Sequence, residues 1–130
     1  MNPGIIANLS LNYNTSFGLN FYVTAQHIGK QYLDNSENEI KNPSARSVAG
    51  YVDKYINAYT VFNAGLSFDV IPALQLKNAH KYINSVELSL KVNNIFDRLY
   101  ETSGSVDGYG VPYWIPAAER NLYFNLKVGL

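Results

Sequence analysis

Hydrophobic and polar residues alternate along five separate stretches of this chain. In the last stretch, Leu122, Phe124, Leu126, Val128 and Leu130 are separated by single residues that are mostly polar. Because successive side chains of a β-strand point to opposite faces, this pattern predicts a strand with one apolar face and one polar face. Alternation of the same kind predicts strands over five ranges: 7–13, 17–26, 59–70, 86–93 and 121–130.

The charged residues in these stretches lie on one side only. Asp69, Glu87, Lys91 and Lys127 all fall on the predicted polar faces, and no charged residue falls on an apolar face. Such segregation is typical of a sheet whose two faces meet different environments. The sequence therefore predicts an all-β, antiparallel fold.

The predicted connections follow a regular order of lengths. A tight turn over 14–16 is followed by a long polar segment over 29–55, a medium one over 71–84 and a second long loop over 101–119. Short turns on one side and long loops on the other are typical of an up-and-down transmembrane β-barrel, whose long loops lie outside the cell. In this topology both long segments are extracellular.

Composition narrows the function classes. The chain has 130 residues, ten basic and ten acidic side chains, and no cysteine. Balanced charge gives no electrostatic support for nucleic-acid binding, and without cysteine neither disulfides nor thiolate chemistry are available. No apolar run approaches the roughly 20 residues that a membrane-spanning helix needs. The 11 tyrosines fit the aromatic girdles that outer-membrane barrels place at the membrane interfaces.

No group of residues supports an active site or a metal site. Asp97 and Glu101 lie near a loop, where carboxylates are usually solvated, and no serine has a histidine at a spacing suited to a catalytic triad. The only two imidazoles, His27 and His80, fall at opposite rims of the predicted sheet, whereas a metal site needs three or four converging ligands. We therefore expect a protein that is not an enzyme and has no cofactor.

The segment 86–101 carries a motif that can be compared with a known family. An alternating strand there runs into Asn-Asn-Ile-Phe-Asp, and a tyrosine follows three residues later. This segment resembles the penultimate strand of TonB-dependent outer-membrane receptors. The matching residues are Asn93, Asn94, Ile95, Phe96, Asp97 and Tyr100.

Other segments extend the resemblance over nearly the whole chain. Residues 28–35 and 59–68 resemble a loop and the following strand of Bacteroidetes-type receptors. Trp114, Pro116 and Arg120 resemble the approach to the final strand in the siderophore and vitamin B12 receptor branch. The resemblance implies that these are the last five strands of a 22-stranded barrel. Since bacterial membrane barrels have at least about eight strands, we expect this chain to be the C-terminal part of a larger barrel.

The resemblance also implies a function and its partners. The family carries out TonB-dependent uptake of iron chelates (siderophores or haem) or cobalamin at the outer membrane of Gram-negative cells. The implied partners are outer-membrane lipid, the receptor's own plug domain, TonB acting through that plug, and the barrel-assembly machinery, which reads the C-terminal strand. The plug, the TonB box and a signal peptide are missing from these residues, so we do not expect the chain alone to transport. Leu130 and Glu119 depart from the family, which usually has an aromatic residue and often a glycine at these positions.

Two groups of residues are candidate sites under this interpretation. Polar side chains facing the barrel lumen and plug would be Asn20, Gln26, Asn63, Asp69, Glu87, Lys91, Asn93, Asn125 and Lys127. Candidate extracellular ligand contacts are Tyr51, Tyr55, Tyr109, Tyr113 and Trp114. Tyr and Trp give large contact areas at small entropic cost. The alternative is that these aromatic residues form the interfacial girdle or pack on neighbouring loops.

Two other interpretations of the whole chain stay open at this point. The alternating strands also suit a small soluble β-sandwich, secreted or periplasmic, that packs its apolar faces together and serves as a binding module. The chain would then be monomeric in solution without detergent. A non-functional gene remnant is the third interpretation.

Overall fold

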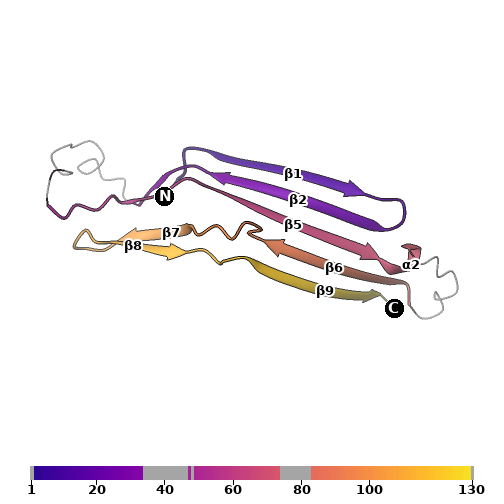
Figure 1. The fold of residues 1–130 in the computed structure, drawn as a ribbon. Helices are drawn as coiled ribbons and strands as arrows, with labels where there is room; N and C mark the ends of the chain where they lie inside the picture. The colour runs from indigo at the N-terminus through magenta and orange to yellow at the C-terminus, as the bar shows by residue number, and fades with distance from the viewer. Residues whose placement is uncertain (1, 34–46, 48, 74–82, 130) are drawn as a thin grey trace. The chain divides into compact units, whose positions relative to one another are not determined.

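The computed structural model describes residues 2–33, 47, 49–73 and 83–129. Strands make up most of these residues. The predicted all-β class with antiparallel pairing is confirmed. Figure 1 shows the long strands, which are β1 (Ile6–Asn14), β2 (Leu19–Ile28), β5 (Tyr59–Asp69), β6 (Ser85–Asn93) and β9 (Asn121–Gly129). Each corresponds to one of the five strands predicted from the alternation.

The long strands form one sheet in the order β1–β2–β5–β6–β9, which is also their order along the chain. Each long strand therefore lies beside the one before it and the one after it, which is an up-and-down arrangement. β1 and β9 form the two edges of this sheet. A four-residue helical turn, α2 (Val70–Ala73), follows β5. Within the described residues, no helix has both the length and the apolar character needed to cross a membrane.

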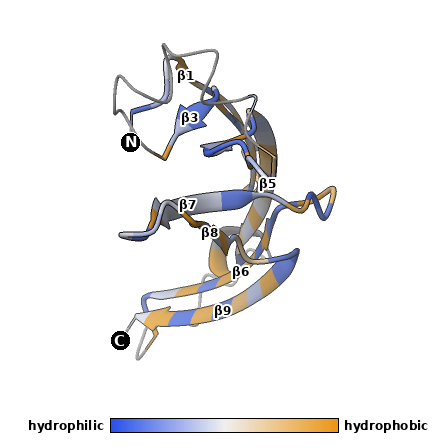
Figure 2. Ribbon diagram, turned by 90° about the vertical axis from the view of Figure 1, so that its left-hand side faces the viewer, coloured by the Kyte–Doolittle hydropathy of each residue, from blue (hydrophilic) through white to orange (hydrophobic). Residues whose placement is uncertain are grey.

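Apolar and polar residues form separate rows across β5, β6 and β9. Leu66 lies opposite Leu90, and Leu90 lies opposite Phe124 on the next strand. The rows on the other face are Gly65–Lys91–Tyr123, Ser67–Ser89–Asn125 and Asp69–Glu87–Lys127. Figure 2 shows the resulting alternation of hydrophobic and hydrophilic bands along β9. The register aligns the apolar positions of neighbouring strands with one another, and likewise the other positions, so the apolar and polar faces predicted for single strands extend across these three strands.

The chain divides into two compact units. Unit 1 comprises Met1–Ala7, His27–Thr60 and Leu99–Ala118, and unit 2 comprises Asn8–Gln26, Val61–Arg98 and Glu119–Leu130. Unit 2 holds most of the five-stranded sheet. Unit 1 holds two short antiparallel ribbons, β3 (Gln31–Tyr32) with β4 (Tyr55–Ile56), and β7 (Glu101–Val106) with β8 (Pro112–Pro116).

Unit 1 has a small core of its own. Ile56 is only 1% exposed, and Ile28 and Tyr59 are also buried. The ring of Tyr59 lies 4.3 Å from the ring of Tyr100, measured between centroids, at an interplanar angle of 31°. Leu33 donates its backbone N–H to the carbonyl of Lys54 at 2.8 Å, which extends the pairing of β3 with β4 by one residue. These contacts give the two ribbons a fixed base.

In unit 2, the polar side of β5 is more enclosed than its apolar side. Val61 and Gly65 are buried, whereas Leu66 on the opposite face is 40% exposed. Tyr22 lies over the backbone of Gly65, where an added Cβ would overlap its phenol ring. An aromatic side chain that covers a strand glycine in this way shields the backbone from water. Gly65 is therefore required by close packing rather than by its backbone conformation.

The two ribbons lie mostly within the long polar segment and the second long loop, where the sequence predicted no strands, and that part of the prediction was wrong. Gly104, within the second long loop, lies in β7 opposite Trp114 of β8. Glu101–Val106 is rich in Ser, Thr and Gly and lacks the apolar alternation that identifies the other strands. Main-chain pairing holds this strand, so its sequence carries little hydropathy signal.

Two strand ends also differ from the prediction. β2 begins at Leu19 rather than residue 17, because Thr15 caps the turn: the Leu19 N–H donates to Thr15 Oγ1 at 2.9 Å, and Gly18 adopts a φ of 87°. The strand predicted over 59–70 ends at Asp69, and Val70 begins the helical turn. Pro72 suits this position because the first turn of a helix needs no N–H from it.

Candidate functional site

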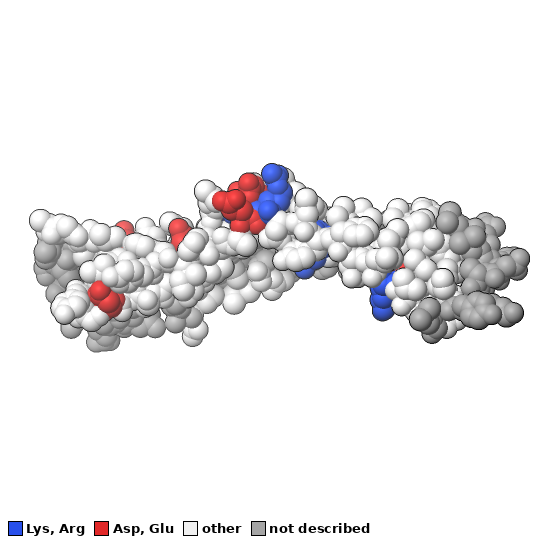
Figure 3. Space-filling view, turned by 90° about the horizontal axis from the view of Figure 1, so that it is seen from below, with Lys and Arg blue, Asp and Glu red and all other residues white. Residues whose placement is uncertain are grey.

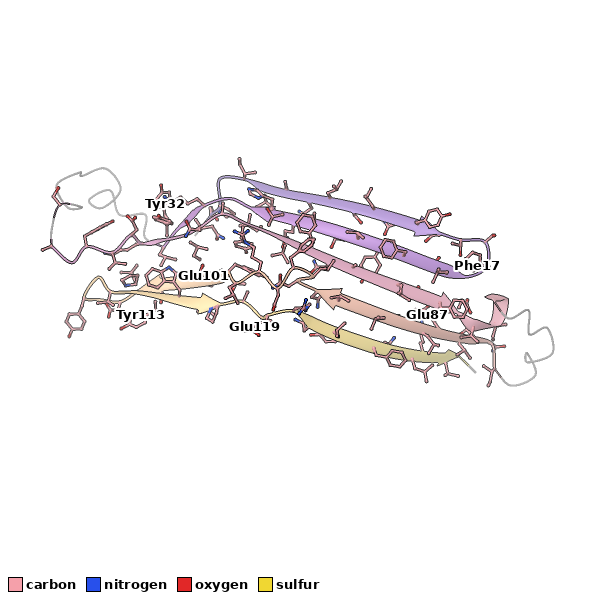
Figure 4. The ribbon with its side chains drawn as sticks, viewed as in Figure 1. Phe17, Tyr32, Glu87, Glu101, Tyr113 and Glu119 are labelled. Atoms are coloured by element: carbon pink, nitrogen blue, oxygen red, sulfur yellow. The ribbon has the colours of Figure 1, made fainter. Side chains whose placement is uncertain are left out.

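The β7–β8 ribbon positions three of the five aromatic candidates. Tyr113 and Trp114 lie on β8, opposite Ser105 and Gly104 of β7. Tyr109 lies in the turn between the strands and is 95% exposed. In Figure 4, Tyr113 is labelled on this ribbon. The ribbon therefore presents its aromatic side chains at an exposed surface of unit 1.

Asp107 organises the turn of this ribbon. Its Oδ1 accepts hydrogen bonds from the backbone N–H groups of Val111 at 2.8 Å and of Tyr109 at 2.9 Å. Gly110 follows with a φ of 84°, in the left-handed region that favours glycine. The hydrogen bond from Val111 is the largest of the effects that hold the pKa of the Asp107 carboxyl below its usual value. The charged carboxylate thus fixes the turn that carries Tyr109.

The other two aromatic candidates lie on or near β4. Trp114 donates its Nε1–H to the carbonyl of Tyr55 at 3.2 Å, which joins the two ribbons within unit 1. The ammonium of Lys30 lies 3.4 Å from the centroid of the Tyr55 ring and 5.1 Å from that of Tyr32. Tyr51 is half-buried in the segment before β4. The face of an aromatic ring attracts a cation through its quadrupole, so Lys30 makes a cation–π contact here.

A pocket of about 340 Å³ opens beside these contacts in unit 1. The described residues that line it are Val52, Asp53, Tyr55, Asn57, Glu101 and Trp114. The structure thus brings together Tyr55 and Trp114, which were candidates from sequence. Asp53, Asn57 and Glu101 were not identified as contacts, since they lie outside the predicted strands and no local pattern marks them. Figure 4 labels Glu101 on β7.

All nine polar residues predicted to face a lumen lie in unit 2. Asn20 Nδ2 donates to Ser67 Oγ at 3.4 Å, and Asn63 Nδ2 donates to Thr24 Oγ1 at 3.3 Å. These bonds place the polar side chains of β2 and β5 on one face. Gln26 lines a second pocket of about 340 Å³ in unit 2, together with Asn8, Ser10, Thr24 and Asn63 among others. Asn93 Nδ2 donates to Asn121 Oδ1 at 2.8 Å on the neighbouring strand.

The charged part of this face lies in the Asp69–Glu87–Lys127 row. One carboxylate oxygen of Asp69, Oδ1, is buried and accepts no hydrogen bond from the described residues. Asp69 and Glu87 are direct cross-strand neighbours, an arrangement in which like charges repel. Lys127, of the opposite charge, lies opposite Glu87 on the next strand. Figure 4 labels Glu87 on β6.

The Asn-Asn-Ile-Phe-Asp motif, where the apolar alternation of the strand breaks off, forms a tight turn after β6. Asn94 and Asp97 have φ values of 51° and 54°, in the left-handed region where Asn and Asp are enriched. The Asn94 side chain accepts a hydrogen bond from the Arg98 N–H and donates one to the Arg98 carbonyl, both at 2.9 Å. The motif residues therefore have a structural role in unit 2.

Charged side chains are sparse on the surface seen in Figure 3. Most of that surface is uncharged, and acidic and basic side chains gather mainly in one place.

The two histidines do not form a site with each other among the described residues. His27 Nδ1 lies 2.9 Å from Thr60 Oγ1, and His80 lies outside the described residues. Among residues 2–33, 47, 49–73 and 83–129, no group of His, Cys, Asp or Glu has an arrangement suited to a metal ion.

Comparisons of this chain with protein-family models, with characterised proteins and with solved structures find no match. Its function therefore has to be inferred from its own residues and geometry.

Proposed function

We propose that this chain is the C-terminal segment of the β-barrel of a TonB-dependent outer-membrane receptor. In this proposal the five long strands are the last five of a 22-stranded barrel that takes up an iron chelate or cobalamin. The apolar face of the sheet contacts lipid, and the polar face lines the lumen and contacts the plug domain. The TonB-dependent energy input acts on the plug, so the part played by this segment is to form the wall and part of the outer surface.

The exposure of the apolar face is the observation that carries the proposal. Phe124 on β9 is 72% exposed and Leu11 on β1 is 65% exposed, and their apolar neighbours on the same strands are exposed as well. An apolar face on this scale is unfavourable in water, at roughly 25 cal/mol for each Å². Lipid removes that cost without a second protein layer. A soluble sandwich would instead need a partner sheet over the same face.

The edges of the sheet support a larger barrel. β1 and β9 each have one neighbour in the five-stranded sheet. In hydrocarbon, each backbone N–H or C=O left without a partner costs several kcal/mol, so a β-sheet is stable there only as a closed barrel. Further strands pairing with both edges would satisfy these groups. The up-and-down order of the long strands is the order that such a barrel requires.

The turn motif and its surroundings support the choice of family. Asn94 and Asp97 take backbone conformations that Asn and Asp adopt more readily than most residues. Asp97 Oδ1 accepts the backbone N–H of Arg120 at 2.7 Å, so the motif is joined to the start of β9. Asp97 and Arg120 both belong to the segments that resemble TonB-dependent receptors. The motif therefore has a physical reason to recur wherever the last two strands of such a barrel pair.

Flotation with lipid vesicles tests the membrane part of this proposal. The 130-residue chain is refolded in the presence of vesicles, floated on a density gradient and washed with urea. Because the open edges of a single copy are unfavourable in hydrocarbon, we expect it to stay with the vesicles as an oligomer whose copies pair along β1 and β9, and to acquire strand signal by circular dichroism. A chain that remains monomeric and folded in buffer without lipid would support the soluble sandwich and contradict the proposal.

Transport is tested by grafting the chain onto a receptor that lacks its own last five strands. Restored heat-modifiable migration on gels shows that the barrel closes, and restored growth on the receptor's iron chelate shows that it functions. The matched control is the same graft with Leu126→Arg, which places a charge on the lipid face. A graft that never closes, although the chain floats with vesicles, would contradict the assignment to this family.

A further inference from the structure

The pocket in unit 1 combines aromatic walls with negative charge. Tyr55 and Trp114 supply the aromatic surfaces, and Asp53 and Glu101 supply two carboxylates. None of the described lining residues is basic. Asp53 is exposed and Glu101 is half-buried, so both remain accessible to a bound molecule. The described lining thus carries two carboxylates around about 340 Å³ of space, enough for a small organic group, with the Lys30 ammonium on the ring of Tyr55 as the neighbouring positive charge.

The same aromatic cluster already holds one cation. The Lys30 ammonium lies 3.4 Å from the centroid of the Tyr55 ring, closer than the roughly 6 Å limit for such contacts. The Tyr55 carbonyl also accepts the Trp114 Nε1–H, which fixes the indole beside the tyrosine. This contact demonstrates that the local geometry allows a positive charge to approach an aromatic face. It occurs next to the pocket and involves one of its walls.

We propose that this pocket binds a compact organic cation, an ammonium group with alkyl substituents. The carbon shell of such a group contacts Trp114 and Tyr55, and its charge faces the carboxylates of Asp53 and Glu101. A neutral group of the same shape would gain the contact with the rings but not the electrostatic attraction. An anion would be repelled by both carboxylates. The inference goes beyond the proposed function, because the organic cation is a different ligand from the iron chelate or cobalamin that the barrel takes up.

Trp114 is the only tryptophan in the chain, so its fluorescence reports on this pocket alone. The full chain, refolded in detergent, is titrated with choline and, separately, with 3,3-dimethylbutan-1-ol, which has the same shape without the charge. We expect choline to change the Trp114 emission with millimolar affinity, and the alcohol to bind more weakly by about tenfold. Raising the salt concentration should weaken choline binding but leave the alcohol unaffected.

Two variants test the carboxylates. Glu101→Gln and Asp53→Asn should each weaken choline binding by about threefold to tenfold and leave the alcohol unchanged. Glu119→Gln removes the same charge at a residue that is not among those that line the pocket, and is the matched control. Circular dichroism checks that each variant keeps its strand content, so that a loss of binding is not a loss of fold.

Several outcomes would overturn the inference. The first is an equal response to choline and to its neutral analogue. The second is no response at choline concentrations up to about 100 mM, well above a millimolar dissociation constant. The third is equal weakening of choline binding by Glu101→Gln and Glu119→Gln. Binding is measured in detergent solution, whereas membrane insertion is measured by flotation. If choline binds but the chain does not float with vesicles, the proposed function is contradicted and the inference about the pocket stands. If the chain floats but choline does not bind, the inference about the pocket is contradicted and the proposed function stands.

Discussion

The side-chain Oδ1 of Asn63 accepts a hydrogen bond from the backbone N–H of Asn94 at 3.0 Å. This bond ties the middle of β5 to the turn after β6. Ile95 repeats the connection, since its N–H donates to the carbonyl of Phe62 at 2.9 Å. The turn is therefore anchored on the central strand of the sheet, and Asn94 is only 3% exposed. Its stability follows from these buried polar contacts.

Replacing Asn94 with Ala should destabilise unit 2 by about 2–4 kcal/mol, because two hydrogen bonds to Arg98 are lost and Ala disfavours a left-handed φ. Asn94→Gly adopts the left-handed φ without strain, so it should lose less stability than Asn94→Ala. Its remaining loss then measures the contribution of the side-chain hydrogen bonds. Urea titration of the chain in detergent measures the difference. Asn93→Ala is the control: it loses one half-buried bond to Asn121 and should cost about 0.5–1.5 kcal/mol. Equal effects at both positions would contradict the structural role assigned to Asn94.

Neighbouring residues on β9 should respond in opposite ways to arginine. Leu126 lies in a row with Leu88, and Asn125 lies in the polar row with Ser89. Leu126→Arg puts a charge on the proposed lipid face, at a cost of about 2–4 kcal/mol near the middle of the membrane, and should abolish assembly. Asn125→Arg should be tolerated. Vesicle flotation of the two variants compares them, and equal loss in both would show that the faces are assigned wrongly.

Gly65→Ala should destabilise unit 2 by about 1–3 kcal/mol, because the added Cβ overlaps the Tyr22 ring and forces it from its place on the sheet. Gly108→Ala is the matched control, since an added Cβ there meets nothing within 4 Å. Urea midpoints of the two variants give the comparison. If Gly65→Ala is as stable as Gly108→Ala, Tyr22 does not pack on Gly65 in solution.

The turn at Asp107 should open in acid. Its folded pKa is lowered, so the stabilisation is present above the pKa of the unfolded chain, near 3.8, and is lost as the pH falls through the still lower folded pKa. Amide hydrogen exchange at Tyr109 and Val111 should therefore accelerate below about pH 4 relative to the intrinsic rate. Asp107→Asn keeps an oxygen acceptor without the charge, so the acid-dependent change should disappear. Persistence of that change in the variant would assign it to another group.

The five long strands could be predicted because their apolar residues recur at every second position over seven or more residues. The row of Leu66, Leu90 and Phe124 is the spatial form of that pattern. The ribbons could not be predicted in this way. β7 is held by main-chain bonds in a Ser-, Thr- and Gly-rich segment, and β3 and β4 contain two residues each.

The pocket was predicted only in part. Tyr55 and Trp114 stand out in the sequence as aromatic residues in long polar segments. Asp53 and Glu101 do not, because their proximity depends on how β4 packs against the β7–β8 ribbon, through contacts such as the Trp114–Tyr55 hydrogen bond. The left-handed turn at Asn94 was also missed, since a broken alternation by itself does not distinguish a turn from a bulge.

The two ends of the β7–β8 ribbon lie side by side, since Ala117 donates its N–H to the carbonyl of Tyr100 at 2.9 Å. Closing a loop at its base in this way makes the cost of changing its length small, growing only with the logarithm of the number of residues. Insertions, deletions or wholesale exchange between Glu101 and Pro116 would leave the pairing of Asn93 with Asn121 in unit 2 as it is. The ribbon is thus a site where new binding specificities can arise by recombination while the wall strands keep their register.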